Sequence, residues 1–356
     1  MHILHHQRKR SFARDALITT SVLDKGGEAL KDAYYLFQSG ELQRRNNTLL
    51  LISKSGRKHY IPVMKVDSVH AFGNIILNSR LLDFLSQMGI ALHTYNYYGN
   101  YTGTYYPKDS NISGFLHVKQ AQYFLDPKKR LEIAVSIVHA SIHNMIRIIT
   151  RYSSTVPIME ELQCLHEFKN AALSAQSIHE LMGYEGSARK AYYQAFAKAL
   201  DVDFEGRLKR PPKGRLNALI SFGNTLLYTE TVSRIYQTQL DPSVSFLHEP
   251  STRRFSLCLD LAEMFKPVIV DRIISTLVGK NILNDSDFDD TFDGTYLSRD
   301  GKRKFVELFS RRLKETVTYP RLKRKLSYRN IIQQECYKLI KHLLGIEPYS
   351  AFRVWW

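Results

Sequence analysis

The sequence predicts an α+β protein, in which an N-terminal β-rich domain is followed by a larger all-α domain. Two patterns carry this prediction. Short runs of β-branched and aromatic residues separated by turn residues fill positions 34–107, and long segments with helical spacing of apolar residues follow from position 119. At 356 residues and 44% hydrophobic content, the chain is long enough to bury a core in each domain. We expect the β-rich domain at 31–115 and the helical domain at 116–356, and we assign no role to the basic extension at 1–30.

The β-rich region divides at its turn residues. Strands are predicted around YYLF, before the Asn46-Asn47 turn, at TLLLIS, at KHYIPV, at VDSVHAFG and at IALHTY, mostly as successive hairpins. One helix interrupts them, SRLLDFLSQM, which Asn78 or Ser79 caps and Gly89 ends. The tyrosine-rich segment YYGNYTGTYY forms a last hairpin, whose aromatic side chains we expect to pack along strands and at an interface.

Apolar periodicity then predicts a succession of helices up to the end of the sequence. Their expected positions are 119–124, 127–152, 158–182, 186–201, 211–240, 256–279, 298–318 and 328–344. Within the fourth segment and its approach, Glu185 lies between Gly183 and Gly186, so we expect it just before a helix. No apolar run approaches the length of a membrane span, and the N-terminus lacks the apolar stretch of a signal peptide. We expect a cytoplasmic protein without a membrane partner.

Charge is the strongest compositional signal. The formal net charge is +16, and eleven Lys or Arg stand against three acids between Arg299 and Lys325. A second basic cluster, GRLKRPPKGR, occupies 206–215. Such clustering favours a polyanionic partner, and nucleic acid more than membrane, because no basic helix has the exposed apolar face needed to lie on lipid. The three cysteines show no CxxC spacing, which argues against a zinc ribbon or a disulfide framework.

Two motifs resemble metal-binding motifs but lack residues that the metal site would need. The Asp-rich stretch NDSDFDDTFDG at 284–294 has Asp290 where a calcium loop of the EF-hand type needs glycine, and Tyr296 where it needs glutamate. His139 and His143 have the spacing of a zinc helix, but alanine follows His139 where the zinc-protease motif needs glutamate. We interpret the first as a solvated loop and the second as one face of an ordinary helix.

The segment FLHEPSTRRFSLCLDLAEMFKPVIVD at 246–271 predicts a metal site. His248 precedes a helix that carries Asp260 and Glu263, which are three residues apart and so share a helical face. One histidine with carboxylates suits Mg²⁺ or Mn²⁺ better than structural zinc. A single histidine is more often a satisfied loop residue, so the acids carry the prediction.

A polar stripe precedes this segment. Asn217, Ser221, Asn224 and Tyr228 recur at helical spacing within the apolar segment RPPKGRLNALISFGNTLLYTETVSRI. On such a helix these side chains must be satisfied internally or line a wet cleft.

Together the segments EGSAR at 185–189, RPPKGRLNALISFGNTLLY and FLHEPSTRRFSLCLDLAEMFKPVIVDR resemble the CRISPR-associated integrase of spacer acquisition, the first CRISPR-associated protein family. The resemblance continues in FGNIILNSRLLDFLSQMGIALHTYNYYGNYTGTYYP and in YRNIIQQECYKLIKHLLG with the final FRVWW, and it is closest in style to the type I, subtype B branch. It spans about 34–356.

The resemblance implies roles for individual residues. It places the catalytic metal ligands at Glu185, His248 and Glu263, with Asp260 as a supporting acid. Glutamate at 263 stands where some relatives have aspartate, so the division of roles between Asp260 and Glu263 stays open. Further residues are implied around the DNA backbone and the site, namely Asn217, Tyr228, Arg253, Arg254 and Lys266.

The resemblance also implies an activity and partners. A site holding Mg²⁺ or Mn²⁺ would join the 3′-hydroxyl ends of short donor DNA (prespacers) to the leader–repeat end of a CRISPR array, and with water it would cut DNA. The protein would act on double-stranded DNA as a homodimer, formed through the β-rich domain, in a heteromeric complex with the small second CRISPR adaptation protein. Two alternatives stay open: a stand-alone metal-dependent nuclease acting on branched or double-stranded DNA, and a non-catalytic DNA-binding scaffold.

Overall fold

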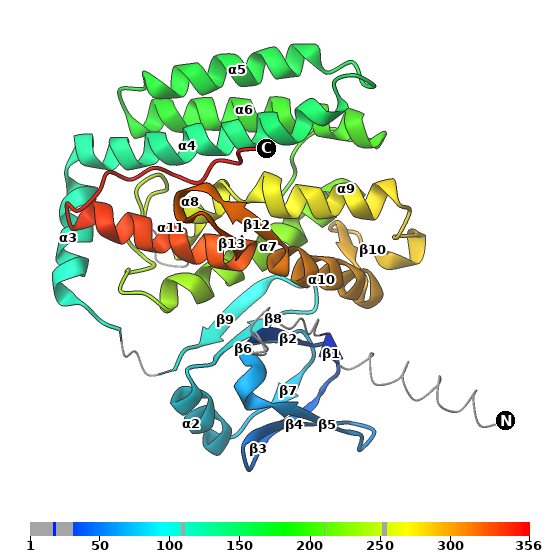
Figure 1. Cartoon of the computed structure of the whole chain (residues 1–356). Helices are drawn as coiled ribbons and strands as arrows, with labels where there is room; N and C mark the ends of the chain where they lie inside the picture. Colours follow the sequence, from blue (N-terminus) through cyan, green and yellow to red (C-terminus); the bar gives the residue numbers. More distant parts are fainter. Residues whose placement is uncertain (1–16, 19–30, 108–110, 210, 251–254) are drawn as a thin grey trace. The chain divides into compact units, whose positions relative to one another are not determined.

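The computed structural model of the chain describes residues 17–18, 31–107, 111–209, 211–250 and 255–356 (Figure 1). These residues belong to two compact units. The first unit consists of Met1–Ser110 with Leu297–Lys314, and the second of Asn111–Tyr296 with Glu315–Trp356. The order of β-rich and helical parts confirms the predicted α+β class.

Two sheets build the first unit. The five-stranded sheet has the order β1-β2-β6-β8-β9, and the four-stranded sheet the order β5-β4-β3-β7. The strands are β1 (Leu17–Ile18), β2 (Asp32–Leu36), β3 (Gly40–Arg45), β4 (Thr48–Ser53), β5 (Lys58–Pro62), β6 (Val66–Ala71), β7 (Ile75–Ile76), β8 (Ala91–Tyr95) and β9 (Tyr101–Tyr105). A short 3-10 turn, η1 (Val63–Lys65), links β5 to β6.

The pairing of these strands is only partly the predicted series of hairpins. Strands β3, β4 and β5 form an antiparallel meander, and β8 pairs with β9 in a hairpin, as expected. The expectation is wrong for β2, β6 and β7, since β2 pairs with β6, β6 with β8, and β3 with β7 in parallel. Parallel neighbours need a crossover connection, which turn residues do not reveal.

Helix α2 (Ser79–Met88) is bounded as the sequence predicts. The side chain of Asn78 accepts a hydrogen bond from the backbone N–H of Leu81 at 2.9 Å. Gly89 ends the helix in the left-handed conformation, with φ of 66°. Leu81, Phe84 and Leu85 then pack into the core of the unit, together with strand residues such as Leu42 and Leu92.

Helix α10 (Arg299–Lys314) also belongs to the first unit. Lys302 donates a hydrogen bond to the carbonyl of Tyr97 at 2.6 Å, and Lys314 forms a buried ion pair with Asp32. The helix stops short of the predicted residue 318 because Thr316–Tyr319 forms a strand, β12. We expected this whole stretch within the helical domain at 116–356, whereas α10 belongs to the first unit.

Helices dominate the second unit. They are α3 (Gly114–Leu125), α4 (Pro127–Ile149), α5 (Met159–Leu173), α6 (Ile178–Leu200), α7 (Arg215–Tyr236), α8 (Ser256–Glu263), α9 (Arg272–Gly279) and α11 (Tyr328–Leu343), with 3-10 turns η2 (Thr150–Tyr152), η4 (Asp285–Asp287) and η5 (Pro320–Leu322). Two short hairpins accompany them, β10 (Phe288–Asp290) with β11 (Thr295–Leu297), and β12 with β13 (Arg324–Ser327).

Helix α4 is the central helix of this unit and contacts α3, α5, α6 and α8 (Figure 1). Asp126 caps its N-terminus by accepting from the N–H groups of Lys128 and Lys129, and Pro127 takes the first helical position. Of the described helices, α4 is the one with the length and apolar composition of a membrane span, but 67% of that window is buried inside the protein. Its apolar character therefore reflects a core position.

Two predicted helix boundaries are wrong. Helix α6 runs through Gly183 and Gly186 without a break, and the break lies earlier, between Ser174 and the cap at Ser177. Each glycine disfavours an interior helical position by only about 0.5–1 kcal/mol, which packing against α4 and α5 can outweigh. The helix predicted at 256–279 is divided by a π-helical segment, η3 (Lys266–Asp271), at Pro267, which lacks the N–H of a regular ladder.

Candidate active site

The carboxylate of Asp260 organises the segment that carries His248. Asp260, on α8, is fully buried and accepts hydrogen bonds from the backbone N–H groups of Phe246, Leu247 and His248 at 2.6, 2.9 and 3.0 Å. It also contacts Nδ1 of the His248 ring at 2.8 Å. An ionised carboxylate can only accept, so Nδ1 carries the proton and the Nε2 lone pair is left for a ligand. Asp260 therefore holds the histidine, and with four hydrogen bonds its two carboxylate oxygens have no acceptor capacity to spare.

The electrostatics of His248 fit this arrangement. Burial of the ring lowers the pKa of His248, but the hydrogen bond and the charge of Asp260, with the charge of Glu263, raise it above its ordinary value. The acid that orients the ring therefore also increases the basicity of its free nitrogen.

Glu185 and Glu263 come from two different helices and meet at one cation. Arg189 follows Glu185 by one turn of α6, and its Nε and Nη2 atoms lie 2.6 and 2.5 Å from Glu185 Oε1. The same Nη2 atom also contacts Oε2 of Glu263 at the end of α8. The two carboxylates thus face a single positively charged nitrogen.

Lys266 supplies a second positive charge to Glu263, because its Nζ atom pairs with the other carboxylate oxygen. Burial alone would raise the pKa of Glu263, but Arg189, Lys266 and His248 together lower it to about 2. Glu263 is therefore an anion at every physiological pH, although its side chain is 6% exposed.

The side chains of Glu185, Glu263 and His248 suit a divalent cation, provided that the Arg189 guanidinium is displaced. Among the described residues, no three His, Cys, Asp or Glu side chains lie together as a ready-made metal site. The point on which Glu185 and Glu263 converge is instead held by the Arg189 guanidinium. Two carboxylates with one imidazole nitrogen are the ligands of Mg²⁺ or Mn²⁺, so a metal fits here in exchange for the guanidinium.

A polar interior lies beside this cluster. Tyr192 donates a hydrogen bond to Oδ2 of Asp271 at 2.9 Å, and burial raises the pKa of Asp271 to about 7. The buried polar atoms that find no hydrogen-bond partner among the described residues include Nη1 of Arg189 and Oδ1 of Asp271. An ordered water molecule or a bound ligand can satisfy such atoms.

The residues implied to contact DNA have other partners in this structure. The Asn217 side chain is 4% exposed and binds the loop that precedes its helix. Its amide oxygen accepts a hydrogen bond from Arg207 at 2.9 Å, and its NH₂ group donates to the carbonyls of Gly206 and Lys213, both at 2.9 Å. The hydroxyl of Tyr228 accepts from the backbone N–H of Phe255 at 3.0 Å, at the start of α8. Asn217 and Tyr228, the two ends of the polar stripe, thus have partners within the protein.

Arg253 and Arg254, the remaining DNA-binding predictions, lie outside the described residues. Arg189 is the site residue that sequence reasoning missed. Its only signal was its position four residues after Glu185, which matters once both are known to lie on one helix.

Comparison with known proteins places these features in a family. The family profile described as "CRISPR associated protein Cas1" matches residues 34–311. The chain is 45% identical over 325 residues to "CRISPR-associated endonuclease Cas1 3" of Thermodesulfovibrio yellowstonii, which covers 91% of this chain and 99% of the relative. It is 41% identical over 334 residues to "CRISPR-associated endonuclease Cas1" of Fusobacterium nucleatum, covering 93% and 99% of the two chains.

Two solved structures also resemble this chain. "Structure of TM1797, a CAS1 protein from Thermotoga maritima" is similar with a TM-score of 0.82 and 42% identity, covering 90% of this chain and 100% of that one. "Casposase bound to integration product" has the same fold at 22% identity, with a TM-score of 0.76 and coverage of 90% and 92%. The similarity spans both units and includes the stretch that carries Glu185, His248 and Glu263, and so the chain belongs to the Cas1 family of CRISPR-associated proteins.

Proposed function

We propose that this chain is a metal-dependent DNA endonuclease and integrase of CRISPR adaptation, which joins the 3′-hydroxyl ends of prespacers to the leader–repeat end of a CRISPR array. The names of its relatives support the nuclease part, and the fold shared with a casposase bound to an integration product supports the joining part. The observation that carries the proposal is the convergence of Glu185 and Glu263 on one cationic nitrogen, with His248 held by Asp260.

In this proposal Glu185, Glu263 and His248 hold Mg²⁺ or Mn²⁺, which when bound supplies stabilisation of negative charge on a phosphodiester. Asp260 keeps the His248 ring in the tautomer that leaves Nε2 free. Lys266 and Arg189 add positive charge where a phosphate would bind, within a largely buried and so weakly screened environment. The joining reaction breaks one phosphodiester bond and forms another. It therefore needs no nucleoside triphosphate as an energy source.

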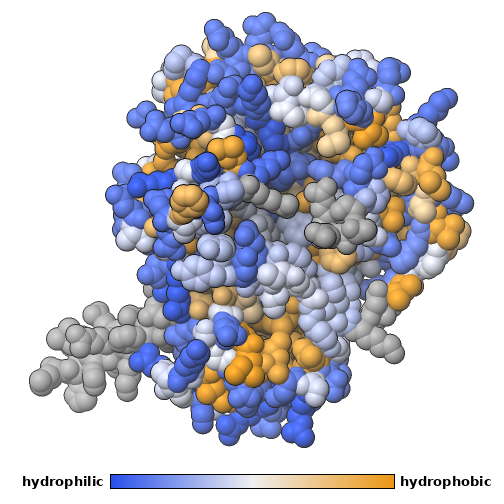
Figure 2. All heavy atoms as spheres, turned by 180° about the vertical axis from the view of Figure 1, so that it is seen from behind, coloured by the Kyte–Doolittle hydropathy of each residue, from blue (hydrophilic) through white to orange (hydrophobic). Residues whose placement is uncertain are grey.

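The proposed partners are double-stranded DNA, a second copy of the chain and the small second CRISPR adaptation protein. A structure titled "Cas6-RT-Cas1--Cas2 complex" contains the same fold over 37% of its matched chain, at 20% identity and with a TM-score of 0.78, which supports the last partner. The lower part of the view in Figure 2, where the strands of the first unit lie, carries a hydrophobic patch. Exposed apolar side chains of this unit, including Met64, Ile76 and Tyr97, support a homodimer formed there.

The test is strand joining. A labelled 3′-hydroxyl donor duplex is incubated with supercoiled plasmid bearing a leader and repeat, with Mn²⁺ or Mg²⁺ and with or without the small partner. We expect metal-dependent transfer of label to the plasmid, and loss of transfer in Glu185→Ala, His248→Ala and Glu263→Ala while DNA binding persists.

Other outcomes decide between the alternatives. Plasmid nicking without joining, even with the partner present, would replace the proposal by a stand-alone nuclease. If the protein neither nicks nor joins DNA, and if its DNA binding is unchanged by metal and by His248→Ala, the chain would be a non-catalytic DNA-binding scaffold.

A further inference from the structure

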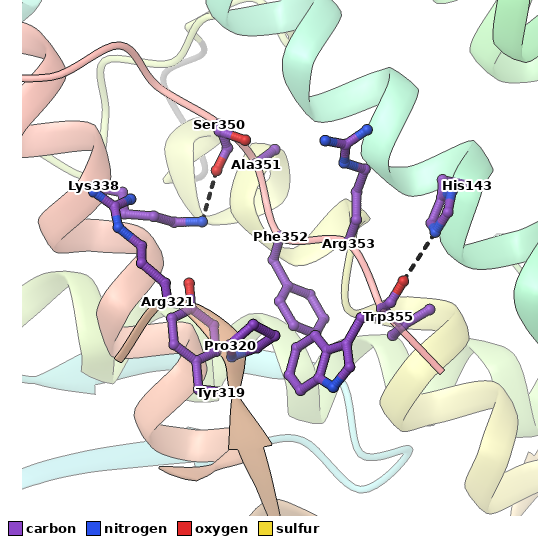
Figure 3. A pocket seen from close by; sticks show the side chains of 11 residues that line it. His143, Tyr319, Pro320, Arg321, Lys338, Ser350, Ala351, Phe352, Arg353 and Trp355 are labelled. Carbon is purple, nitrogen blue, oxygen red and sulfur yellow. Dashed lines mark hydrogen bonds between the residues drawn. The ribbon is translucent and has the colours of Figure 1, made fainter. Parts of the chain in front are cut away.

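An extended segment, Ser350–Trp355, packs against α4 and α11 without regular secondary structure and lines an open pocket (Figure 3). Nε2 of His143, on α4, donates a hydrogen bond to the carbonyl of Val354 at 3.0 Å. Nζ of Lys338, on α11, donates to the carbonyl of Ser350 at 2.7 Å. The segment is therefore fixed to two helices of the second unit.

Asn144 joins this segment to the end of α8. Its side chain is fully buried on α4, and its NH₂ group donates to the carbonyls of Met264 and Phe352 at 2.8 and 3.2 Å. Its amide oxygen accepts from the N–H of Val354 at 2.9 Å. Both donor positions of the amide are used, so its orientation is determined by these three contacts.

The end of α8 needs hydrogen bonds from outside the helix. In a continuous α-helix the carbonyl of Glu263 would accept from the N–H of residue 267, but that residue is Pro267, which has no N–H. Ser141, one turn before Asn144 on α4 and fully buried, donates to this carbonyl at 3.2 Å. Its hydroxyl also accepts from Nη2 of Arg189 at 3.4 Å. Helix α4 thus supplies the donor that the proline removes.

The extended segment also contacts this turn through an aromatic pair. The ring of Phe352 stacks on the ring of Phe265, with centroids 5.0 Å apart and an interplanar angle of 12°. Phe265 lies between Glu263 and Lys266, whose side chains form an ion pair. A fixed backbone at this turn therefore fixes the direction of both charged side chains.

We propose that Asn144 is a positioning residue for Glu263, and that the extended segment, through Asn144 and Phe352, holds the end of α8 in the geometry that binds a divalent ion. Asn144 acts through the backbone of Met264, so it is not itself a ligand. A carboxylate that is already held in place loses less conformational entropy when it binds an ion. The role of Glu263 rests on the proposed function, whereas the support from α4 and the extended segment goes beyond it.

Mn²⁺ affinity without DNA is the first test, measured on the full-length protein by electron paramagnetic resonance of free Mn²⁺. Asn144→Leu nearly preserves the side-chain volume and removes all three hydrogen bonds. We expect its Mn²⁺ affinity to fall by roughly 10- to 100-fold, as is typical when a residue that supports a metal ligand is lost. Arg353→Gln, at the exposed residue next to Phe352, is the matched control and should leave the affinity unchanged. Thermal melts define a temperature at which each variant is folded.

Two smaller changes test the same support if Asn144→Leu does not fold. Ser141→Ala removes the donor to the Glu263 carbonyl, and Phe352→Leu removes the aromatic pair. Each should lower Mn²⁺ affinity. Hydrogen–deuterium exchange measures the support directly, since amides in 256–271 should exchange faster in these variants than in the wild type, while exchange in strands β2 to β9 of the first unit should not change.

Kinetics separate positioning from a loss of DNA binding. In the strand-joining assay Asn144→Leu should lower kcat and leave the KM for DNA unchanged, because DNA binding rests on charge distributed over the surface. Wild-type Mn²⁺ affinity in folded Asn144→Leu, an equal loss of affinity in Arg353→Gln, or unchanged exchange in 256–271 would each overturn the proposal. Hydrogen exchange requires neither metal nor DNA, so a wild-type protein that fails to join DNA would refute the proposed function while exchange still decides this one.

Discussion

His248 Nδ1 and Asp260 Oδ1 lie 2.8 Å apart, and the same carboxylate accepts three backbone N–H groups from residues 246–248. One buried acid therefore folds the loop, selects the histidine tautomer and directs its free nitrogen. Substitution of Asp260 should therefore reduce both stability and activity, whereas substitution of His248 should reduce activity alone.

Asp260→Asn should reduce both stability and activity. The amide is uncharged and cannot use both its oxygen and its NH₂ group as acceptors, so at least one buried hydrogen bond of the charge-assisted kind is lost. We expect the free energy of unfolding to fall by about 1.5–3 kcal/mol, measured by urea denaturation, and DNA cleavage to be lost because the wrong histidine nitrogen is protonated.

His248→Ala is the control, since that side chain is 20% exposed and, among the described residues, contacts only Asp260 by hydrogen bond or ion pair. It should abolish cleavage and change the free energy of unfolding by less than about 1 kcal/mol. Equal destabilisation by the two substitutions would argue against the assigned division of roles.

Arg189→Gln should increase affinity for Mn²⁺. Without the guanidinium, the charges of Glu185 and Glu263 repel each other, so the variant should melt at a lower temperature than the wild type in the presence of chelator and recover when Mn²⁺ is added. Free Mn²⁺ measured by electron paramagnetic resonance gives the affinity directly. Arg189→Lys, which keeps a cation, should stay closer to the wild type, and an unchanged affinity in Arg189→Gln would show that the arginine does not compete with metal.

Asp271 should give the protein a distinct pH dependence. Burial raises the pKa of its carboxyl from 3.8 to about 7, so the folded state holds a proton there that the unfolded state has released. The free energy of unfolding should therefore fall as pH rises from about 4 to 7, and this contribution should be constant above that range. Denaturant titrations across this interval should show a flatter profile for Asp271→Asn, and identical profiles would contradict the raised pKa.

DNA affinity should depend steeply on salt. If roughly six to ten phosphates are neutralised by the basic surface, affinity should fall by a factor of about 10³ to 10⁵ between 50 and 200 mM salt. Fluorescence anisotropy of a labelled duplex measures this slope. A flat response would exclude backbone contacts as the main source of binding.

Tyr97→Asp should weaken self-association. Tyr97 is 77% exposed at the tip of the β8–β9 hairpin of the first unit, where a charge would be desolvated in an apolar interface. Light scattering after size-exclusion chromatography should show a monomer in place of a dimer. Lys280→Gln, a change of an exposed lysine in the second unit, serves as the control, and an unchanged mass in Tyr97→Asp would place the interface elsewhere.

The fold class and some local boundaries follow from sequence because they depend on neighbouring residues. The cap at Asn78 and the left-handed Gly89 are chemical features of single positions, and both appear as predicted. The parallel pairing of β2 with β6 depends on contacts distant in sequence, which local patterns do not encode. The uninterrupted α6 shows the same limit, because packing outweighs two glycines that favour a break.

The candidate site shows a similar division. Residue types and the family resemblance pointed to Glu185, His248 and Glu263, and the structure brings Glu185 and Glu263 to one cation and gives His248 a buried acid as partner. Two features could not be foreseen: the ion pair of Arg189 with Glu263, and the hydrogen bonds of Asn217 to the preceding loop. Each depends on which side chains meet across helices and loops. A polar stripe on a sequence does not say whether its members face a ligand or one another.

The location of Arg189 on the same helix as Glu185 bears on how the protein matures. An acid that enters the interior with its counter-charge already one turn away does not need a metal to offset its loss of hydration. The helices of this unit can therefore assemble without a bound ion. Under the proposed function, synthesis of a folded protein would be independent of the metal supply, and activity would follow the concentration of free metal in the cell.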